Sequence, residues 1–115
     1  MASESIRSGF QRGAMSMIIL SLLSEGDMYG YQLVQEIEKR SEGTVLTQEG
    51  SLYPVLYKLQ EQELISDRKV LVGKRMTRVY YHIEEDGLQY LQDLIREYEK
   101  VTQGIQQIIK GDKNS

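Results

Sequence analysis

The chain of 115 residues contains no cysteine and a single histidine, His82. The lack of cysteine excludes disulfides, thiolate metal sites and cysteine nucleophiles, and one histidine cannot build a multi-histidine metal site. The sequence also has no glycine-rich phosphate loop and no metal-ligand spacing. We therefore expect no metal site, no cofactor and no enzymatic activity.

Long hydrophobic runs are also missing. The longest apolar stretch, residues 17–23, is interrupted by Ser21, whereas a membrane-spanning helix needs about 20 residues. Residues 1–12 carry scattered charges and no apolar core, which argues against a signal peptide. These features predict a cytoplasmic protein without a membrane partner.

The net charge of −3 argues weakly against a nucleic-acid partner, but the charges are unevenly distributed. Five basic residues and no acidic ones lie within 68–78, and six acidic residues accompany only Arg96 within 84–99. A basic patch thus directly precedes an acidic stretch, and charge distribution matters more than net charge for nucleic-acid binding.

Hydrophobic periodicity predicts the order of elements. Helices are expected at 12–24, at 27–41 with Asp27 as its N-cap, and at 48–62 with Thr47 as its cap. Residues 44–46 suit either a short strand or a linker. Two strands, 64–71 and 78–83, flank a basic hairpin tip at 72–77, and one long helix spans 85–110. This order predicts a mainly α (α+β) fold: a winged helix-turn-helix DNA-binding domain (1–84), a C-terminal dimerisation helix (85–110) and a disordered tail (111–115).

The long helix carries an apolar stripe with a 3.5-residue repeat, interrupted by one polar member, Thr102. At about 1.5 Å per residue the helix would run close to 40 Å, too long to fold back fully on so small a domain. We therefore expect the stripe to pair with the same helix of a second subunit. The residues expected at this dimer interface are Leu88, Leu91, Ile95, Tyr98, Ile105 and Ile109.

The sequence contains five short motifs: the opening 10–13 (FQRG), 28–31 (MYGY), 49–54 (EGSLYP), 63–65 (ELI) and 73–81 (GKRMTRVYY). Together these motifs resemble the PadR family of transcriptional regulators. The resemblance covers roughly residues 10–105, and the single final helix is similar to the smaller PadR subfamily. It implies a regulator that binds double-stranded DNA.

The helix at 48–62 is the candidate recognition helix. If Leu52, Leu56 and Leu59 face the core, helical geometry turns the opposite face outward. The residues expected to contact DNA from this helix are Gly50, Ser51, Tyr53, Pro54, Tyr57 and Lys58. The alternatives are an ordinary solvated face and, for Tyr53, a place in the core.

The hairpin carries the remaining expected DNA contacts, Lys69, Lys74, Arg75 and Arg78. Cations at a hairpin tip suit the minor groove or the phosphate backbone, although lysines on hairpins also prevent edge-to-edge pairing. Strand alternation places Arg78 and Tyr80 on one side and Val79, Tyr81 and Ile83 on the other, core-facing side. His82 has no obvious partner, and Gly30 is expected to let the second helix pack closely on the first.

The resemblance further implies an effector pocket between the two final helices of the dimer, with the first helix contributing. Aromatic surfaces and a flexible methionine suit a small planar aromatic ligand. The matching positions are Phe10, Met17, Tyr90, Leu94, Tyr98 and Thr102. The alternative is that these side chains form ordinary dimer core.

Together these features predict a dimeric transcriptional repressor of an inverted-repeat operator, relieved by such a ligand. The alternative is a winged-helix protein–protein interaction module without sequence-specific DNA binding. Charge reversal at Lys74 and Arg75 discriminates the two, because only the first reading requires those charges for DNA binding.

Overall fold

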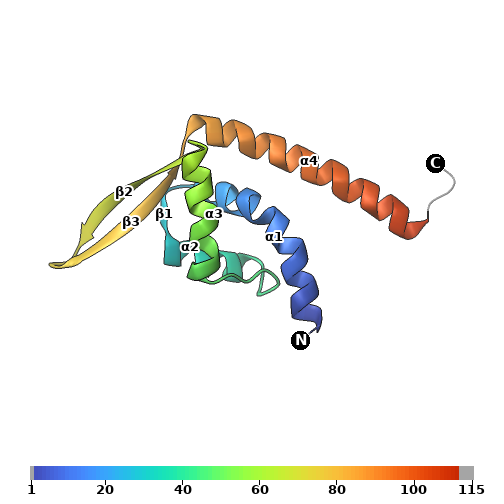
Figure 1. The fold of residues 1–115 in the computed structure, drawn as a ribbon, viewed down its shortest axis with the longest axis horizontal. Coiled ribbons are helices and arrows are strands. Elements are labelled where there is room, and N and C mark those ends of the chain that lie inside the picture. Colours follow the sequence, from blue (N-terminus) through green and yellow to red (C-terminus); the bar gives the residue numbers. More distant parts are fainter. Residues whose placement is uncertain (1, 112–115) are drawn as a thin grey trace.

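The protein is described by a computed structural model that covers the backbone of residues 2–111 and the side chains of residues 5–111. Its elements are α1 (Ala2–Leu23), β1 (Met28–Tyr29), α2 (Gly30–Arg40), α3 (Glu49–Glu61), β2 (Ile65–Val72), β3 (Met76–Ile83) and α4 (Glu85–Lys110). The strands form an antiparallel sheet in the order β1-β3-β2. The predicted fold class, a winged helix-turn-helix followed by a long helix, is confirmed (Figure 1).

The core lies where α1, α2 and α3 meet. Its fully buried side chains come from all three helices: Ile19, Leu20, Leu23, Leu33, Leu52, Leu56 and Leu59. The sheet closes this core through Ile65, Tyr81 and Ile83. The predicted inward faces of the third helix and of the second hairpin strand are therefore confirmed.

The first two helices differ from their predicted limits. The first begins at Ala2, ten residues before the predicted start. Met28 and Tyr29 pair with Tyr81 and Tyr80 of β3, so the second helix starts only at Gly30, and Asp27 is not its cap. Pairing with a distant strand overrides the local helical pattern here.

The connection between α2 and α3 is a linker, not a strand. The Ser41 hydroxyl donates to the Ile37 carbonyl at 2.7 Å and accepts from the Val45 amide at 3.0 Å, which fixes the turn. Helix α3 then begins after Gln48, so Thr47 is not its cap. Pro54 lies inside this helix, in its second turn.

Helix α4 has the predicted limits. Its start is held against the hairpin: the Glu84 amide donates to the Leu64 carbonyl at 2.9 Å, and a Cβ at buried Gly87 would collide with that same carbonyl. The helix then crosses α1 and continues past the rest of the molecule (Figure 1). Gly111 ends it in the left-handed conformation (φ 62°), and residues 112–115 of the expected tail lie outside the described residues.

No helix within residues 2–111 is long and apolar enough to cross a membrane.

Candidate nucleic-acid interface

Helix α3 presents a continuous exposed face next to the hairpin. Gly50, Ser51, Pro54, Tyr57 and Lys58 are all exposed, because the buried leucines take up the opposite side. This face offers hydroxyl, phenol and ammonium groups, which suit phosphate oxygens and base edges.

Tyr53 sits at the edge of that face and is half-buried. Its ring stacks near Tyr57, with centroids 6.2 Å apart, and its hydroxyl donates to Glu49 Oε2 at 3.1 Å. Burial, and then the Glu49 carboxylate, raise the pKa of the Tyr53 phenol. The same ring lies on Gly30, so this glycine allows close approach of α3, and the expected close packing of Gly30 on the first helix is wrong.

The hairpin divides its cations between two faces of the sheet. Lys69 pairs with Val79, on the face that packs against α3, where Gln60 donates to Asp67 at 2.7 Å. Arg78 lies on the opposite face, with its guanidinium 4.3 Å from the centre of the Tyr29 ring. The predicted DNA-contacting cations of the strands therefore do not share one face.

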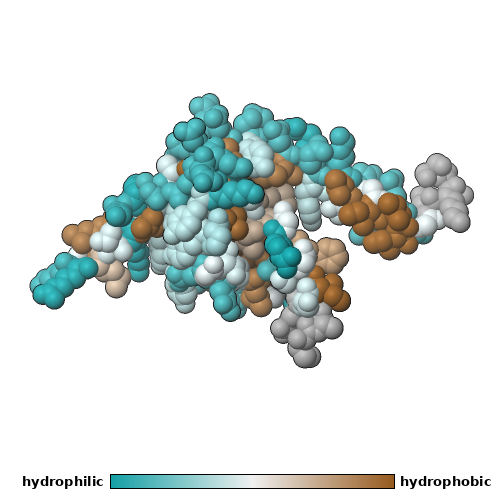
Figure 2. Space-filling model, in the orientation of Figure 1, coloured by the Kyte–Doolittle hydropathy of each residue, from teal (hydrophilic) through white to brown (hydrophobic). Residues whose placement is uncertain are grey.

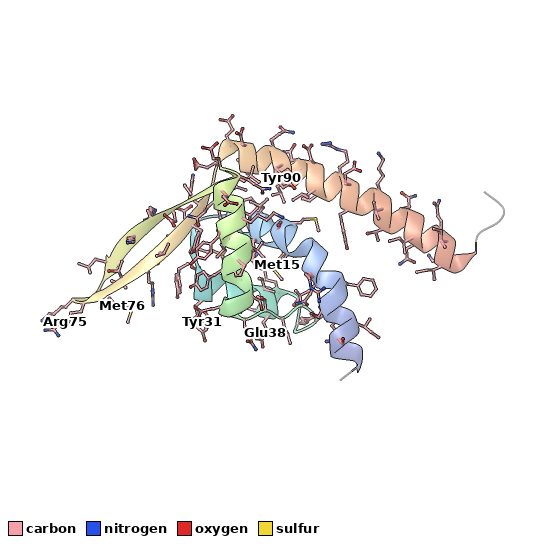
Figure 3. The ribbon with its side chains drawn as sticks, viewed as in Figure 1. Met15, Tyr31, Glu38, Arg75, Met76 and Tyr90 are labelled. Atoms are coloured by element: carbon pink, nitrogen blue, oxygen red, sulfur yellow. The ribbon has the colours of Figure 1, made fainter. Side chains whose placement is uncertain are left out.

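The tip of the hairpin projects away from the body of the protein. Gly73 turns the chain with φ 71°, and Lys74 and Arg75 are exposed to solvent beside it. Leu71 and Met76 are also exposed, by 67% and 60%. Arg75 and Met76 mark the far end of the molecule in Figure 3. The tip thus combines two exposed cations with two apolar side chains.

A cluster of charged and polar side chains that the sequence did not predict joins the hairpin to Asp27. His82 Nδ1 lies 2.8 Å from Asp27 Oδ1, so His82 does have a partner, 55 residues away in sequence. Arg68 donates to the other Asp27 oxygen at 3.2 Å, and its guanidinium lies over the Tyr80 ring. The hydrogen bond with His82, and then that with Arg68, lower the pKa of the Asp27 carboxyl. No sequence signal pointed to this cluster, because the register that pairs Arg68 with Tyr80 is set by the fold.

A second concave region lies between α1, α2 and α4, with a volume of about 460 Å³. Two of the predicted ligand residues, Met17 and Tyr98, line it together with Ile95. At its rim Arg40 pairs with Glu25 at 2.7 Å and with Glu36 at 3.0 Å.

The other predicted ligand residues lie elsewhere. Leu94 packs on the core of its own chain, and Phe10 is 78% exposed on α1. Neither Tyr90 nor Thr102 is among the lining residues of this cavity. Within one chain, the structure therefore brings together only part of the set that sequence reasoning proposed.

The outer part of α4 leaves its apolar stripe uncovered. Five of the six predicted interface residues are at least 38% exposed: Leu88, Ile95, Tyr98, Ile105 and Ile109. Leu91 is the exception, because its own chain already covers it and leaves only 7% of it exposed. Figure 2 shows the brown, apolar atoms gathered on the C-terminal part of α4.

No group of three or more acidic or histidine side chains suited to hold a metal occurs among the described residues.

The sequence model of the transcriptional regulator PadR-like family matches residues 19–93. Over 92% of its length, the chain is also 35% identical to uncharacterized protein X of Lysinibacillus sphaericus and covers 97% of that protein.

Solved structures share the fold. A transcriptional regulator from Clostridium thermocellum is 31% identical and superposes with a TM-score of 0.79, over 87% of this chain and 94% of the other. Bacillus subtilis PadR, solved in complex with operator DNA, is 24% identical with a TM-score of 0.67, over 71% of this chain and 46% of the other.

Proposed function

This chain belongs to the transcriptional regulator PadR-like family, and on that premise we propose that it is a homodimeric repressor of an inverted-repeat operator. Its family and fold are those of transcriptional regulators, not of enzymes. In this function residues 1–84 act as the DNA-binding unit and residues 85–110 as the dimerisation helix.

In each subunit α3 enters a major groove and the hairpin tip contacts the adjacent backbone or minor groove. The exposed polar face of α3 supports this role. The two solvent-exposed cations Lys74 and Arg75 support it too, because they lie at the end of a hairpin whose two strands have 8 residues each. Bacillus subtilis PadR, which shares the fold, was crystallised with its operator.

The observation that carries the dimer is the uncovered apolar stripe of α4. Ile105, Ile108 and Ile109 are exposed by 50%, 80% and 71% on a helix that extends past its own domain. Such a patch on a small protein marks an interaction site. Pairing by a two-fold axis requires an inverted-repeat site, with half-sites separated by about one helical turn, or roughly 34 Å.

The effector is a small planar aromatic molecule bound beside Met17 and Tyr98. The 460 Å³ cavity that these residues line with Ile95 lies within the size range of ligand sites. Because α4 contributes both to this cavity and to the dimer contact, a ligand there shifts the spacing of the two DNA-binding units.

The test is binding of the purified protein to DNA from directly upstream of its own gene, across a salt series, with sedimentation of the same sample. The repressor reading requires a dimer and tight, salt-sensitive binding to an inverted repeat. The variant Lys74→Glu/Arg75→Glu should abolish that binding, whereas Arg96→Glu/Lys100→Glu on α4, which also reverses two charges, should retain it.

A dimer with only weak, sequence-blind binding would contradict the proposal. The exposed Leu71 and Met76 at the hairpin tip would then favour a protein–protein interaction module.

A further inference from the structure

A cleft of about 610 Å³ separates α1 from the start of α3. Its walls come from α1, with Arg7, Gln11 and Arg12, from the linker between α2 and α3, with Leu46, and from the first turns of α3, with Ser51. The wall thus contains two guanidinium groups, and none of the residues that line it is acidic.

One side chain of α1 joins this helix to the linker that forms the opposite wall of the cleft. The Gln11 side-chain amide donates to the Leu46 carbonyl, and its oxygen accepts from the Leu46 amide at 3.3 Å. One side chain thus satisfies both backbone groups of a residue 35 positions away. This contact also places Arg7 and Arg12 next to the linker, because they lie within about one helical turn of Gln11 on α1.

Neither arginine is neutralised within the part of the chain whose side chains the structure describes. The basic residues that form ion pairs there are Arg40, Arg68, His82, Arg96 and Lys100. The acidic residue at the start of α3, Glu49, instead accepts the Tyr53 hydroxyl on another side of the helix. Within residues 5–111 these two cations have no ion-pair partner, and they lie beside hydroxyl and amide groups, an arrangement that suits a phosphate.

We propose that this cleft is a second phosphate-binding site, in which Arg7 and Arg12 hold the DNA backbone on the side of α3 opposite the hairpin. The inference rests on the proposed function and extends it to residues of α1. Ser51 joins the two surfaces, since it lines the cleft and also lies on the exposed face of α3. A recognition helix in a major groove has a phosphate strand on each side, and the hairpin reaches only one of them.

The experiment measures the affinity for operator DNA and for a scrambled duplex as a function of salt concentration. The variant Arg7→Gln/Arg12→Gln should weaken binding to both DNAs by the same factor, because phosphate contacts carry no sequence information. The slope of log K against log salt should fall by about 0.9 for each phosphate that the variant leaves without its arginine, or by about 2 per subunit.

Two controls make the result specific. Arg7→Lys/Arg12→Lys keeps the charges and should restore most of the slope. Arg96→Gln/Lys100→Gln removes the same number of charges from the exposed face of α4 and should leave the slope unchanged. Circular dichroism of each variant checks that the fold is intact.

The outcomes separate the two proposals. If the wild-type protein shows no salt-sensitive binding to either duplex, the proposed function itself fails. If it binds and Arg7→Gln/Arg12→Gln keeps the wild-type slope, this cleft is not a DNA-phosphate site. Titration of DNA-free protein with inorganic phosphate, followed by the arginine Nε resonances, then distinguishes a free-anion site; binding there without any slope change would also overturn the assignment to DNA.

Discussion

The contact between Gly30 and Tyr53 couples α2 to the recognition helix α3. Adding one methyl group at position 30, by Gly30→Ala, tests this contact. A Cβ at position 30 would lie 2.6 Å from the Tyr53 hydroxyl oxygen and 3.0 Å from the ring carbon that carries it. Moving Tyr53 away would break the hydrogen bond of its hydroxyl to Glu49 and shift its ring relative to that of Tyr57. Gly30→Ala therefore overpacks a buried site, and such changes typically cost about 2 kcal/mol of unfolding free energy.

For a domain of this size, that loss corresponds to a decrease in Tm of roughly 8 °C. Tyr53→Phe removes the closest atom and leaves ring carbons at 3.0 and 3.2 Å, so it should recover about 1 kcal/mol in the Gly30→Ala background. Alone, Tyr53→Phe loses only a half-exposed hydrogen bond and should cost less than about 1 kcal/mol. The loss of unfolding free energy in the double variant should thus be smaller than the sum of the losses in the two single variants.

Denaturant unfolding of the four proteins, at one fixed concentration because a dimer gains stability by mass action, measures this coupling. Operator binding of the same proteins reports whether the displaced Tyr53 disturbs the exposed face of α3. A Gly30→Ala protein with the wild-type midpoint, or a strictly additive double variant, would refute the reasoning, since the hydroxyl would then not be the group that resists the methyl.

Three further perturbations address dimerisation and pH. Ile105→Asp/Ile109→Asp places carboxylates on a stripe that its own chain leaves exposed, so sedimentation should show a folded monomer; a persistent dimer would locate the interface elsewhere. Burial raises the pKa of Tyr81 to about 12. The buried neutral phenol therefore contributes its full stability below about pH 10, and this contribution is lost as the pH rises towards 12. Tyrosinate absorbance should show a late-titrating group that Tyr81→Phe removes. The lowered pKa of Asp27, caused first by its hydrogen bond with His82, stabilises the fold above about pH 4, and this stabilisation is lost as pH falls further. Asp27→Asn should therefore lower the free energy of unfolding at pH 7, measured in urea, by about 1 kcal/mol for a partly exposed group, and the difference from wild type should shrink as the pH falls below about 4.

The sequence by itself determined the elements whose stability is local or periodic. The leucines at 52, 56 and 59 identified the buried face of α3 and hence its exposed face. The limits of α4, 85–110, followed from a stripe that persists over the whole helix. Periodicity is encoded within each element, so it can be read without knowing what the element packs against.

Tertiary structure decided how separate segments meet. Only strand pairing turned Met28 and Tyr29 from predicted helix into β1, and only the same pairing brought Asp27 to His82. The extent of α1 was also missed, because its early residues Ile6 and Phe10 bury no face against their own domain and so follow no core-facing pattern.

The faces on which the hairpin cations lie, and the walls of the cleft, likewise could not be predicted from the sequence alone. Register places Lys69 and Arg78 on opposite faces, and that register depends on which residues of the two strands pair. The walls of the cleft between α1 and α3 meet where Gln11 binds the backbone of Leu46, 35 residues away. Contacts over such distances leave no periodic signal in the chain, so they become visible only once the fold has brought their partners together.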